Sequence, residues 1–269
     1  MCPVACQSIA ALLIQRMAQD RFLNPPLPDI IQQWQYYLRV LAPAPGAVIL
    51  DIGCHSGDAE RLLLRDYPQI AKVIGIDLKQ KSVDAALAQW TQDGQPAAIE
   101  FQLADARQLP FPDGHFDRVV CAETLEYIDD PRLALREMRR VLRPGGAALL
   151  IHTDFDTQVF NAADKALCRR LVTAFSDSGP NGQMGRALYG LCAASGFAQV
   201  EPAVYTLVNT EWRPDRYAYR LAHMMIEWLR LEQRATDDEL ARWLADLEAQ
   251  AARGQFYFSI NRYLCVCRK

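Results

Sequence analysis

The sequence of 269 residues lacks the long apolar runs and dense basic clusters of membrane and nucleic-acid-binding proteins. No stretch of 18 or more apolar residues occurs, so we expect no membrane span. The formal net charge is −3, which argues against nucleic acid or anionic lipid as a partner. The first residues carry no basic segment before an apolar core, so we expect no secretory signal.

Paired cysteines are also missing. The eight cysteines are scattered, and none forms a Cys-x-x-Cys pair. We interpret them as reduced residues that act as small apolar side chains, which favours a cytoplasmic protein. Clusters at metal-ligand spacing are absent from the sequence as well, so we expect no bound metal.

Strands alternate with helices over residues 44–205. Apolar runs predict buried strands at 47–52, 72–77, 98–103, 116–121 and 147–152. The segments between these runs carry apolar residues at helical spacing, as at Leu135, Met138 and Leu142. This alternation predicts right-handed βαβ units and a doubly wound, mainly parallel α/β sheet, with a nucleotide-binding core over 44–205.

Helical segments flank the predicted core. Residues 5–42 are typical of an N-terminal helical arm, interrupted near Pro25 and Pro26. A late strand near 198–208, a charged helical insert over 209–254 and a final strand within 255–269 predict an antiparallel edge hairpin that carries a helical lid. We therefore expect a single domain over 1–269 with a seven-stranded sheet.

The turn after the first predicted strand has the composition of a ligand-binding loop. Gly53 and Gly57 let the backbone approach a ligand closely, and the start of the following helix offers free N–H groups to an anion. A Gly-x-x-x-Gly pattern alone is more typical of a tight turn between a strand and a helix. The dinucleotide fingerprint Gly-x-Gly-x-x-Gly would need glycine at both His55 and Asp58, so NAD is not favoured.

Acidic residues follow the next two predicted strands. Asp77 ends the second strand, where a carboxylate can accept hydrogen bonds from a ribose diol. Asp105 follows the third strand and can accept a hydrogen bond from the exocyclic amine of adenine. Because ligands bind at the carboxyl ends of parallel strands, these residues and the glycine loop together predict a nucleoside site.

This series of motifs closely resembles the class I S-adenosylmethionine-dependent methyltransferases, and more narrowly their ubiquinone/menaquinone-biosynthesis-like (methyltransferase type 11) branch. The resemblance covers roughly residues 45–155 and includes close matches at 109–117 and 141–146. It implies a Rossmann-like fold and S-adenosyl-L-methionine as the cofactor, with S-adenosyl-L-homocysteine as the product. It places these residues on the cofactor: Asp51, Gly53, Cys54, His55, Gly57, Asp77, Leu78, Ala104, Asp105, Ala106, Cys121, Ala122 and Glu123.

One position departs from the family pattern Asp/Glu-x-Gly-x-Gly-x-Gly, because His55 replaces the middle glycine. If the backbone needs a positive φ there, histidine is more tolerant than most residues but still unfavourable. The imidazole could lower cofactor affinity, or it could point into the substrate space and act as a base. We expect cofactor binding, since Asp51, Gly53 and Gly57 are intact.

Methyl transfer from a sulfonium is an in-line displacement that needs a base only when the nucleophile carries a proton. His152, at the end of the fifth strand, is a candidate base, with Asp154 or Asp156 to orient it, and His55 is a second candidate base on position alone. The alternative is a strand cap followed by a turn. Aromatic residues that could line a pocket for a planar or apolar substrate, or simply form core, are Trp34, Tyr37, Tyr217, His223 and Trp228.

We therefore expect an enzyme that methylates an O, N or C atom of a small molecule. The alternative is a protein of the same fold that binds the cofactor but catalyses cyclisation or isomerisation, or serves as a binding scaffold. A nucleic-acid or protein methyltransferase is less favoured, because no Asn/Asp-Pro-Pro-Tyr/Phe motif follows the fourth strand. The sequence leaves monomer and homodimer open.

Overall fold

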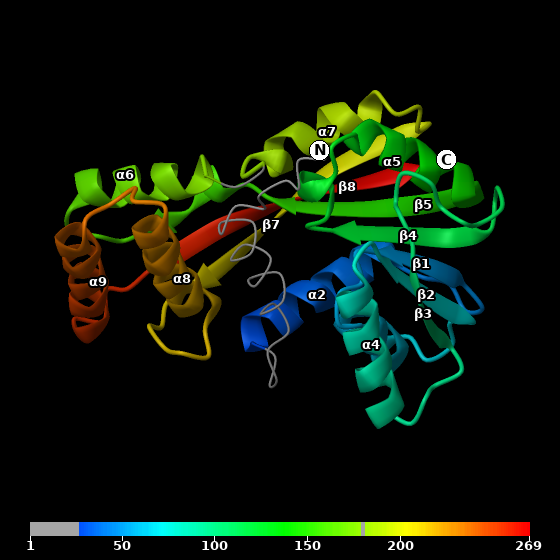
Figure 1. Cartoon of the computed structure of the whole chain (residues 1–269), viewed down its shortest axis with the longest axis horizontal. Coiled ribbons are helices and arrows are strands. Elements are labelled where there is room, and N and C mark those ends of the chain that lie inside the picture. The colour runs from blue at the N-terminus through cyan, green and yellow to red at the C-terminus, as the bar shows by residue number, and fades with distance from the viewer. Residues whose placement is uncertain (1–26, 179–180) are drawn as a thin grey trace, which may run out of the picture. The chain divides into compact units, whose positions relative to one another are not determined.

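The computed structural model describes residues 27–178 and 181–269 (Figure 1). These residues form two compact units. One combines 31–152, 184–205 and 262–269, and the other combines the described parts of 1–30, 153–183 and 206–261. The first half of the predicted N-terminal arm, together with Cys2 and Cys6, lies outside the described residues.

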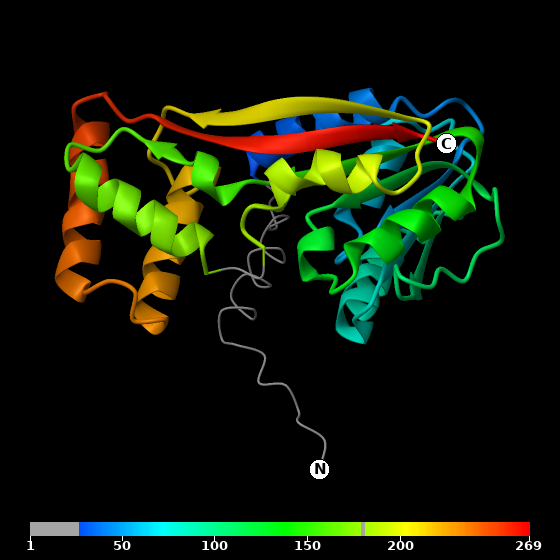
Figure 2. The ribbon, with the colours of Figure 1, turned by 90° about the horizontal axis from the view of Figure 1, so that it is seen from above.

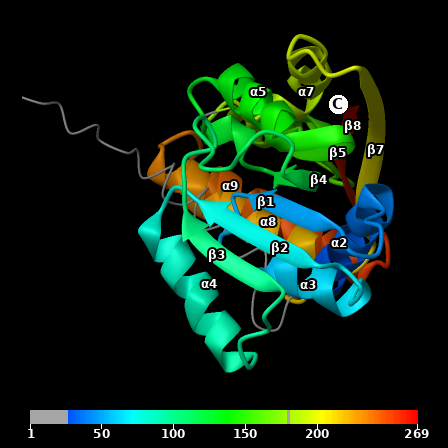
Figure 3. The ribbon, with the colours of Figure 1, turned by 90° about the vertical axis from the view of Figure 1, so that its right-hand side faces the viewer.

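The first unit contains a sheet in the order β3-β2-β1-β4-β5-β8, with β7 paired to β8. Strands β1, β2, β3, β4 and β5 are joined by parallel pairings (Figure 3). The strand order reverses between β1 and β4, which is where ligands bind in such sheets. The predicted doubly wound, mainly parallel sheet is confirmed. Its strands are β1 (Val48–Ile52), β2 (Lys72–Asp77), β3 (Ile99–Leu103), β4 (Phe116–Ala122), β5 (Leu142–Thr153), β7 (Gln199–Asn209) and β8 (Phe258–Arg268).

Helices cover both faces of this sheet because successive strand residues point to opposite faces. On one face, Leu50 and Val119 pack with Met138 and Leu188, and all four side chains are fully buried. The opposite face of β1 carries Asp51, which meets the first turn of α3. The helices of this unit are α2 (Pro28–Leu41), α3 (Asp58–Asp66), α4 (Gln80–Gln92), α5 (Pro131–Val141) and α7 (Met184–Ala193), and α2 begins in the second unit.

Strand β5 begins earlier than the sequence predicts. The sequence analysis places this strand at 147–152, but the preceding segment Arg143–Gly146 also lies within the strand. Gly145 has φ +76°, and the register with β4 shifts between Phe116 and Arg118, as in a β-bulge. Glycine at this point allows the strand to continue through the irregularity instead of ending there.

The second unit is mainly helical. It contains α6 (Lys165–Ser176), α8 (Tyr217–Leu231), α9 (Asp237–Ala252) and the short strand β6 (Val159–Phe160). The three helices contact one another, and β6 pairs antiparallel with the start of β8 (Figure 2). The predicted insert thus folds as α8 and α9, and β6 is an eighth strand that the sequence analysis missed. A role for these helices as a lid stays a prediction.

Two findings bear on the cysteines and on membranes. The six cysteines in the described part of the chain are free and buried. None of the described helices combines the length and apolar character that crossing a bilayer requires.

A capping box starts α9 and gives a test of the helical unit. Thr236 Oγ1 accepts from the Glu239 N–H at 3.3 Å, and the Thr236 N–H donates to Glu239 Oε2 at 2.9 Å. We expect Thr236→Ala to lower the free energy of unfolding by about 1 kcal/mol, measured by urea denaturation with amide exchange in α9. The control Thr91→Ala removes only a bond to the Leu87 carbonyl within α4 and should cost less than about 0.5 kcal/mol. Equal losses would contradict a specific capping role.

Candidate functional site

The loop after β1 is fixed to two neighbouring strand ends. The N–H groups of Gly53 and Cys54 both donate to the carbonyl of Ile76, at 2.8 and 3.0 Å. Gly53 has φ +85°, and a Cβ there would collide with the side chain of Thr124. The Thr124 hydroxyl itself donates to the Ile52 carbonyl at 3.2 Å. Glycine is therefore required at position 53 both for its φ and for space.

His55 adopts the backbone conformation of the glycine that it replaces. Its φ is +51°, in the left-handed region that the sequence analysis considered. Its N–H donates to Asp77 Oδ2 at 3.3 Å, and its ring Nδ1 lies 3.0 Å from Ser56 Oγ. The Ser56 hydroxyl donates in turn to Asp58 Oδ2 at 2.6 Å. The imidazole is thus held beside the start of α3 by local polar contacts.

Asp77 lies at the carboxyl end of β2, and each of its carboxylate oxygens accepts one hydrogen bond. Oδ1 accepts from the Lys79 N–H at 2.9 Å and Oδ2 from the His55 N–H. Each carboxylate oxygen can accept a second hydrogen bond, so the group can still receive a diol. Leu78 and Leu103 are 63% and 51% exposed, and Leu103 pairs with Asp77 across β2 and β3. A carboxylate acceptor near exposed apolar side chains fits the sugar and base of a nucleoside.

Asp105 is engaged by a neighbour that the sequence analysis did not consider. Arg107 Nη2 lies 2.8 Å from Oδ2, Nε lies 3.1 Å from both oxygens, and the Arg107 N–H donates to Oδ1 at 2.8 Å. Hydrogen bonding by Arg107 lowers the pKa of Asp105. The carboxylate therefore stays ionised but has less free acceptor capacity, and its contact with adenine stays a prediction. Ala104 is half-buried and Ala106 is buried.

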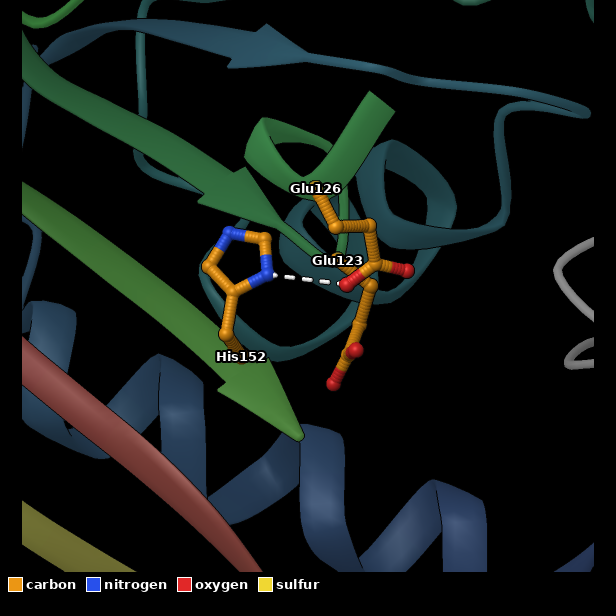
Figure 4. A group of neighbouring side chains, drawn as sticks. All are labelled: Glu123, Glu126 and His152. Atoms are coloured by element: carbon orange, nitrogen blue, oxygen red, sulfur yellow. Dashed lines mark hydrogen bonds and ion pairs between the residues drawn. The ribbon is translucent and has the colours of Figure 1, made fainter. Parts of the chain in front are cut away.

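A cluster of acid–base residues lies at the ends of β4 and β5. His152 is fully buried, and its Nδ1 lies 3.2 Å from Glu126 Oε2 (Figure 4). Glu126 comes from the short 3₁₀ helix Leu125–Tyr127 that follows β4. Glu123, with φ +51°, ends β4 and has Oε1 3.7 Å from Nη1 of Arg262. Carboxylate–imidazole pairs of this kind orient general bases.

Glu123, Glu126 and His152 also satisfy a spacing that metal ligands need. One ligand atom from each lies within 4.8 Å of the others. The sequence analysis missed this group because it joins residues of two strand ends. Arg262 already places a positive charge beside Glu123, which disfavours a second cation at the same carboxylate.

The acid that contacts His152 is thus Glu126, not Asp154 or Asp156. Asp154 is buried and its Oδ1 accepts from the Asp156 N–H at 3.1 Å, so it caps a short 3₁₀ turn. Asp156 Oδ2 accepts from Gln183 Nε2 at 3.0 Å. Both aspartates form the turn that follows the strand, as in the alternative that the sequence analysis considered for them.

Most of the aromatic substrate candidates are packed into cores. Trp34 and Tyr37, 5% and 1% exposed, meet edge to face with ring centroids 5.5 Å apart. In the helical unit, Trp228 is 1% exposed. The ring of His223 stacks on Tyr219 at 4.1 Å, and its Nδ1 lies 2.8 Å from the Tyr219 carbonyl oxygen. The half-buried Tyr217 lies near Phe258, with ring centroids 6.2 Å apart. A substrate role for these five residues stays a prediction.

Burial dominates the electrostatics beneath the loop. It raises the pKa of Asp51 to about 7 and also raises the pKa of Glu60, which lies in the first turn of α3. It likewise raises the pKa of the Cys54 and Cys121 thiols, so neither is a thiolate nucleophile at neutral pH. Glu60 was not predicted as a site residue, because a glutamate in a charged helical segment is usually exposed to solvent.

Comparisons with known proteins agree with this geometry. Residues 50–150 match the family model described as "Methyltransferase domain" (Methyltransf_11). The chain is 31% identical over 237 residues to an uncharacterized 37.1 kDa protein in transposon TN4556 of Streptomyces fradiae, covering 86% of this chain and 65% of that protein. It is 34% identical over 123 residues to the ubiquinone/menaquinone biosynthesis C-methyltransferase UbiE of Desulfotalea psychrophila, covering 45% and 48% of the two chains.

Solved structures show the same fold. The YcgJ protein of Bacillus subtilis superposes with a TM-score of 0.59 at 19% identity, covering 88% of this chain and 98% of that one. The chain spans less than two thirds of the length of the two curated relatives above.

The strained backbone at His55 gives a direct test of the loop. We expect His55→Gly to bind S-adenosylmethionine at least as tightly as the parent and to gain up to about 1 kcal/mol in stability, because glycine adopts positive φ freely. Calorimetric titration and denaturation measure the two effects. Gln95→Gly is the matched control, since Gln95 has φ +54° in an exposed turn. Weaker binding by His55→Gly alone would show that the imidazole is a binding group.

Proposed function

We propose that residues 50–150, which match the methyltransferase-domain model, form a class I S-adenosylmethionine-dependent methyltransferase domain, and that the chain methylates an O, N or C atom of a small molecule. The observation that carries the proposal is the carboxyl edge of β1, β2 and β4. There the Gly53–Gly57 loop and Asp77 lie next to the segment that leads to Glu126 and His152.

The residues at this edge fit the cofactor that the family uses. Bound S-adenosylmethionine supplies a methyl group activated by attachment to a sulfonium. In our proposal Asp77 accepts from the ribose diol and the Gly53–Gly57 loop surrounds the methionine part. Leu78 and Leu103 provide apolar surface for the base, with Asp105 and Arg107 at its polar edge.

His152 serves as the general base in this proposal, and Glu126 positions it. If Nδ1–H donates to Glu126 Oε2, then Nε2 carries the lone pair that can accept a proton. Nε2 is buried and has no hydrogen-bond partner among residues 27–178 and 181–269, so none of these residues competes for that lone pair. Burial also keeps bulk water from the base.

A base at this position favours a nucleophile that carries a proton. Phenols, enols and hydroquinones meet this requirement, because loss of a hydroxyl proton raises the reactivity of the oxygen, or of a conjugated carbon, toward an electrophilic methyl group. The curated relative UbiE is named as a quinone-biosynthesis C-methyltransferase. We therefore propose an aromatic or enolisable small molecule as substrate, whose oxygen or carbon attacks the methyl carbon in line with the departing sulfur.

The cofactor site is tested by calorimetric titration with S-adenosylmethionine and S-adenosylhomocysteine. We expect micromolar binding, on the order of −8 kcal/mol, and a loss of tenfold or more in Asp77→Asn. Asp84→Asn is the control, because Asp84 is an exposed acid of α4 that accepts a hydrogen bond from Gln80 Nε2. Undiminished binding by Asp77→Asn would mean that the ribose lies elsewhere.

The base is tested by following release of S-adenosylhomocysteine with a panel of phenols and hydroquinones. We expect His152→Ala to lower kcat by about 10²-fold or more, and Glu126→Gln to lower kcat with KM and cofactor affinity unchanged. His115→Ala is the control, since His115 stacks on Phe111 at the start of β4, the opposite end of the strand. Full turnover by His152→Ala with normal cofactor affinity would remove His152 from the mechanism.

A further inference from the structure

Glu60 is a carboxylate buried directly behind the Gly53–Gly57 loop. Its side chain is 0% exposed, and neither Oε1 nor Oε2 has a hydrogen-bond partner within the described parts of the chain. A Cβ on Gly75 of β2 would collide with Glu60 Oε1 and would lie 2.8 Å from the Cβ of Cys54. The carboxylate thus occupies space that exists because β2 has glycine at this point.

The group that faces Glu60 is another carboxyl, that of Asp51. Asp51 lies within β1 and is 4% exposed. Two ionised carboxylates have no hydrogen to share, so the pair can form a hydrogen bond only when one member holds a proton. Burial raises the pKa of both groups, and that of Asp51 reaches about 7. Near neutral pH the pair therefore holds a proton in the protein without ligand.

The surrounding charges do not neutralise this pair. Asp77 of β2 adds negative potential at Asp51, and Asp58 of α3 adds it at Glu60. Cys54 of the loop stays a neutral thiol, and β3 and α4 present Phe101 and Ala86 near the loop. Arg61 is paired with Asp58, at 3.1 Å, and lies on the exposed side of α3. Within residues 27–178 and 181–269, neither Asp51 nor Glu60 forms an ion pair with a lysine or arginine.

We propose that Asp51 and Glu60 form a proton-linked counter-charge for the cofactor: the pair holds one proton in the free protein and releases it to solvent when the positively charged cofactor enters the loop. The inference rests on the proposed function. It assigns Glu60 as a residue that distinguishes the cofactor from its product.

The discrimination follows from the charges of the two ligands. S-adenosylmethionine carries a sulfonium and a net charge of about +1 at neutral pH, whereas S-adenosylhomocysteine has a thioether in its place and no net charge. A buried anionic pair attracts the sulfonium strongly because the local dielectric constant is low. After methyl transfer that attraction is lost and the pair takes a proton back from solvent, so the product is held less tightly.

Titration calorimetry in buffers of different ionisation enthalpy measures the proton directly. At pH 7 we expect the protein to release between about 0.5 and 1 proton per S-adenosylmethionine bound, and clearly less with S-adenosylhomocysteine. Between pH 6 and pH 8 the affinity for S-adenosylmethionine should rise by up to about tenfold more than that for S-adenosylhomocysteine. In Glu60→Gln we expect the proton release and the pH-dependent gain in affinity for S-adenosylmethionine over S-adenosylhomocysteine both to fall toward zero. The control is Asp66→Asn, which changes an exposed acid of the same helix and should behave like the parent.

Denaturation of the ligand-free protein gives an independent reading. Because the folded pKa values are raised, the unfolded chain releases protons that the folded protein keeps between about pH 4 and pH 7, so stability falls as pH rises through this window. Glu60→Gln should remove most of this decrease in the free energy of unfolding with pH. If Glu60→Gln does not fold, the same measurement is made on Asp51→Asn.

The outcomes separate this inference from the proposed function. Absence of S-adenosylmethionine binding to the parent protein would overturn the proposed function and the inference together. If the binding enthalpy of S-adenosylmethionine does not depend on the ionisation enthalpy of the buffer, or if Glu60→Gln releases as many protons as the parent, the inference is overturned and the proposed function stays intact.

Discussion

The carboxyl edge of the sheet depends on the contact between the loop after β1 and the loop after β4. The Thr124 hydroxyl reaches the Ile52 carbonyl because Gly53 has no side chain in the way. The same loop is held to β2 by two N–H groups on one carbonyl, that of Ile76. Three strand ends are therefore fixed relative to one another by hydrogen bonds to backbone carbonyls, and this fixes the positions of the acidic residues that follow each strand.

Two groups of charges lie at this edge, and they differ in how they are neutralised. At the ends of β4 and β5, Glu123 is balanced by Arg262, and Glu126 has the imidazole of His152. Behind the β1 loop, Asp51 and Glu60 face each other, and no lysine or arginine of the described residues forms an ion pair with either. Buried acids without a positive partner cost stability, and a bound cation relieves that cost. Leaving Asp51 and Glu60 without a counter-charge therefore adds to the binding free energy of a positively charged ligand.

The sequence predicted the regular elements well because strands buried on both faces are nearly continuous apolar runs, as at Ile74 and Ile76. The predicted start of β5 was wrong, because Gly145 permits a β-bulge within the strand where the sequence analysis began the strand only at residue 147. It also missed contacts between residues far apart in the chain. Glu126 and His152 are separated by 26 positions, and nothing in the local pattern shows that a glutamate at position 60 is buried. Such contacts are set by packing, which periodicity does not reveal.

The close approach of Gly75 to Glu60 has an evolutionary consequence. Any side chain at position 75 needs the space that the glutamate occupies, so the two positions cannot change independently. A lineage that keeps the acid has to keep the glycine, whereas one that replaces the glycine also has to make room beside the Cβ of Cys54 and the ring of Phe101. Relatives with this fold that carry the buried glutamate should therefore also carry the glycine.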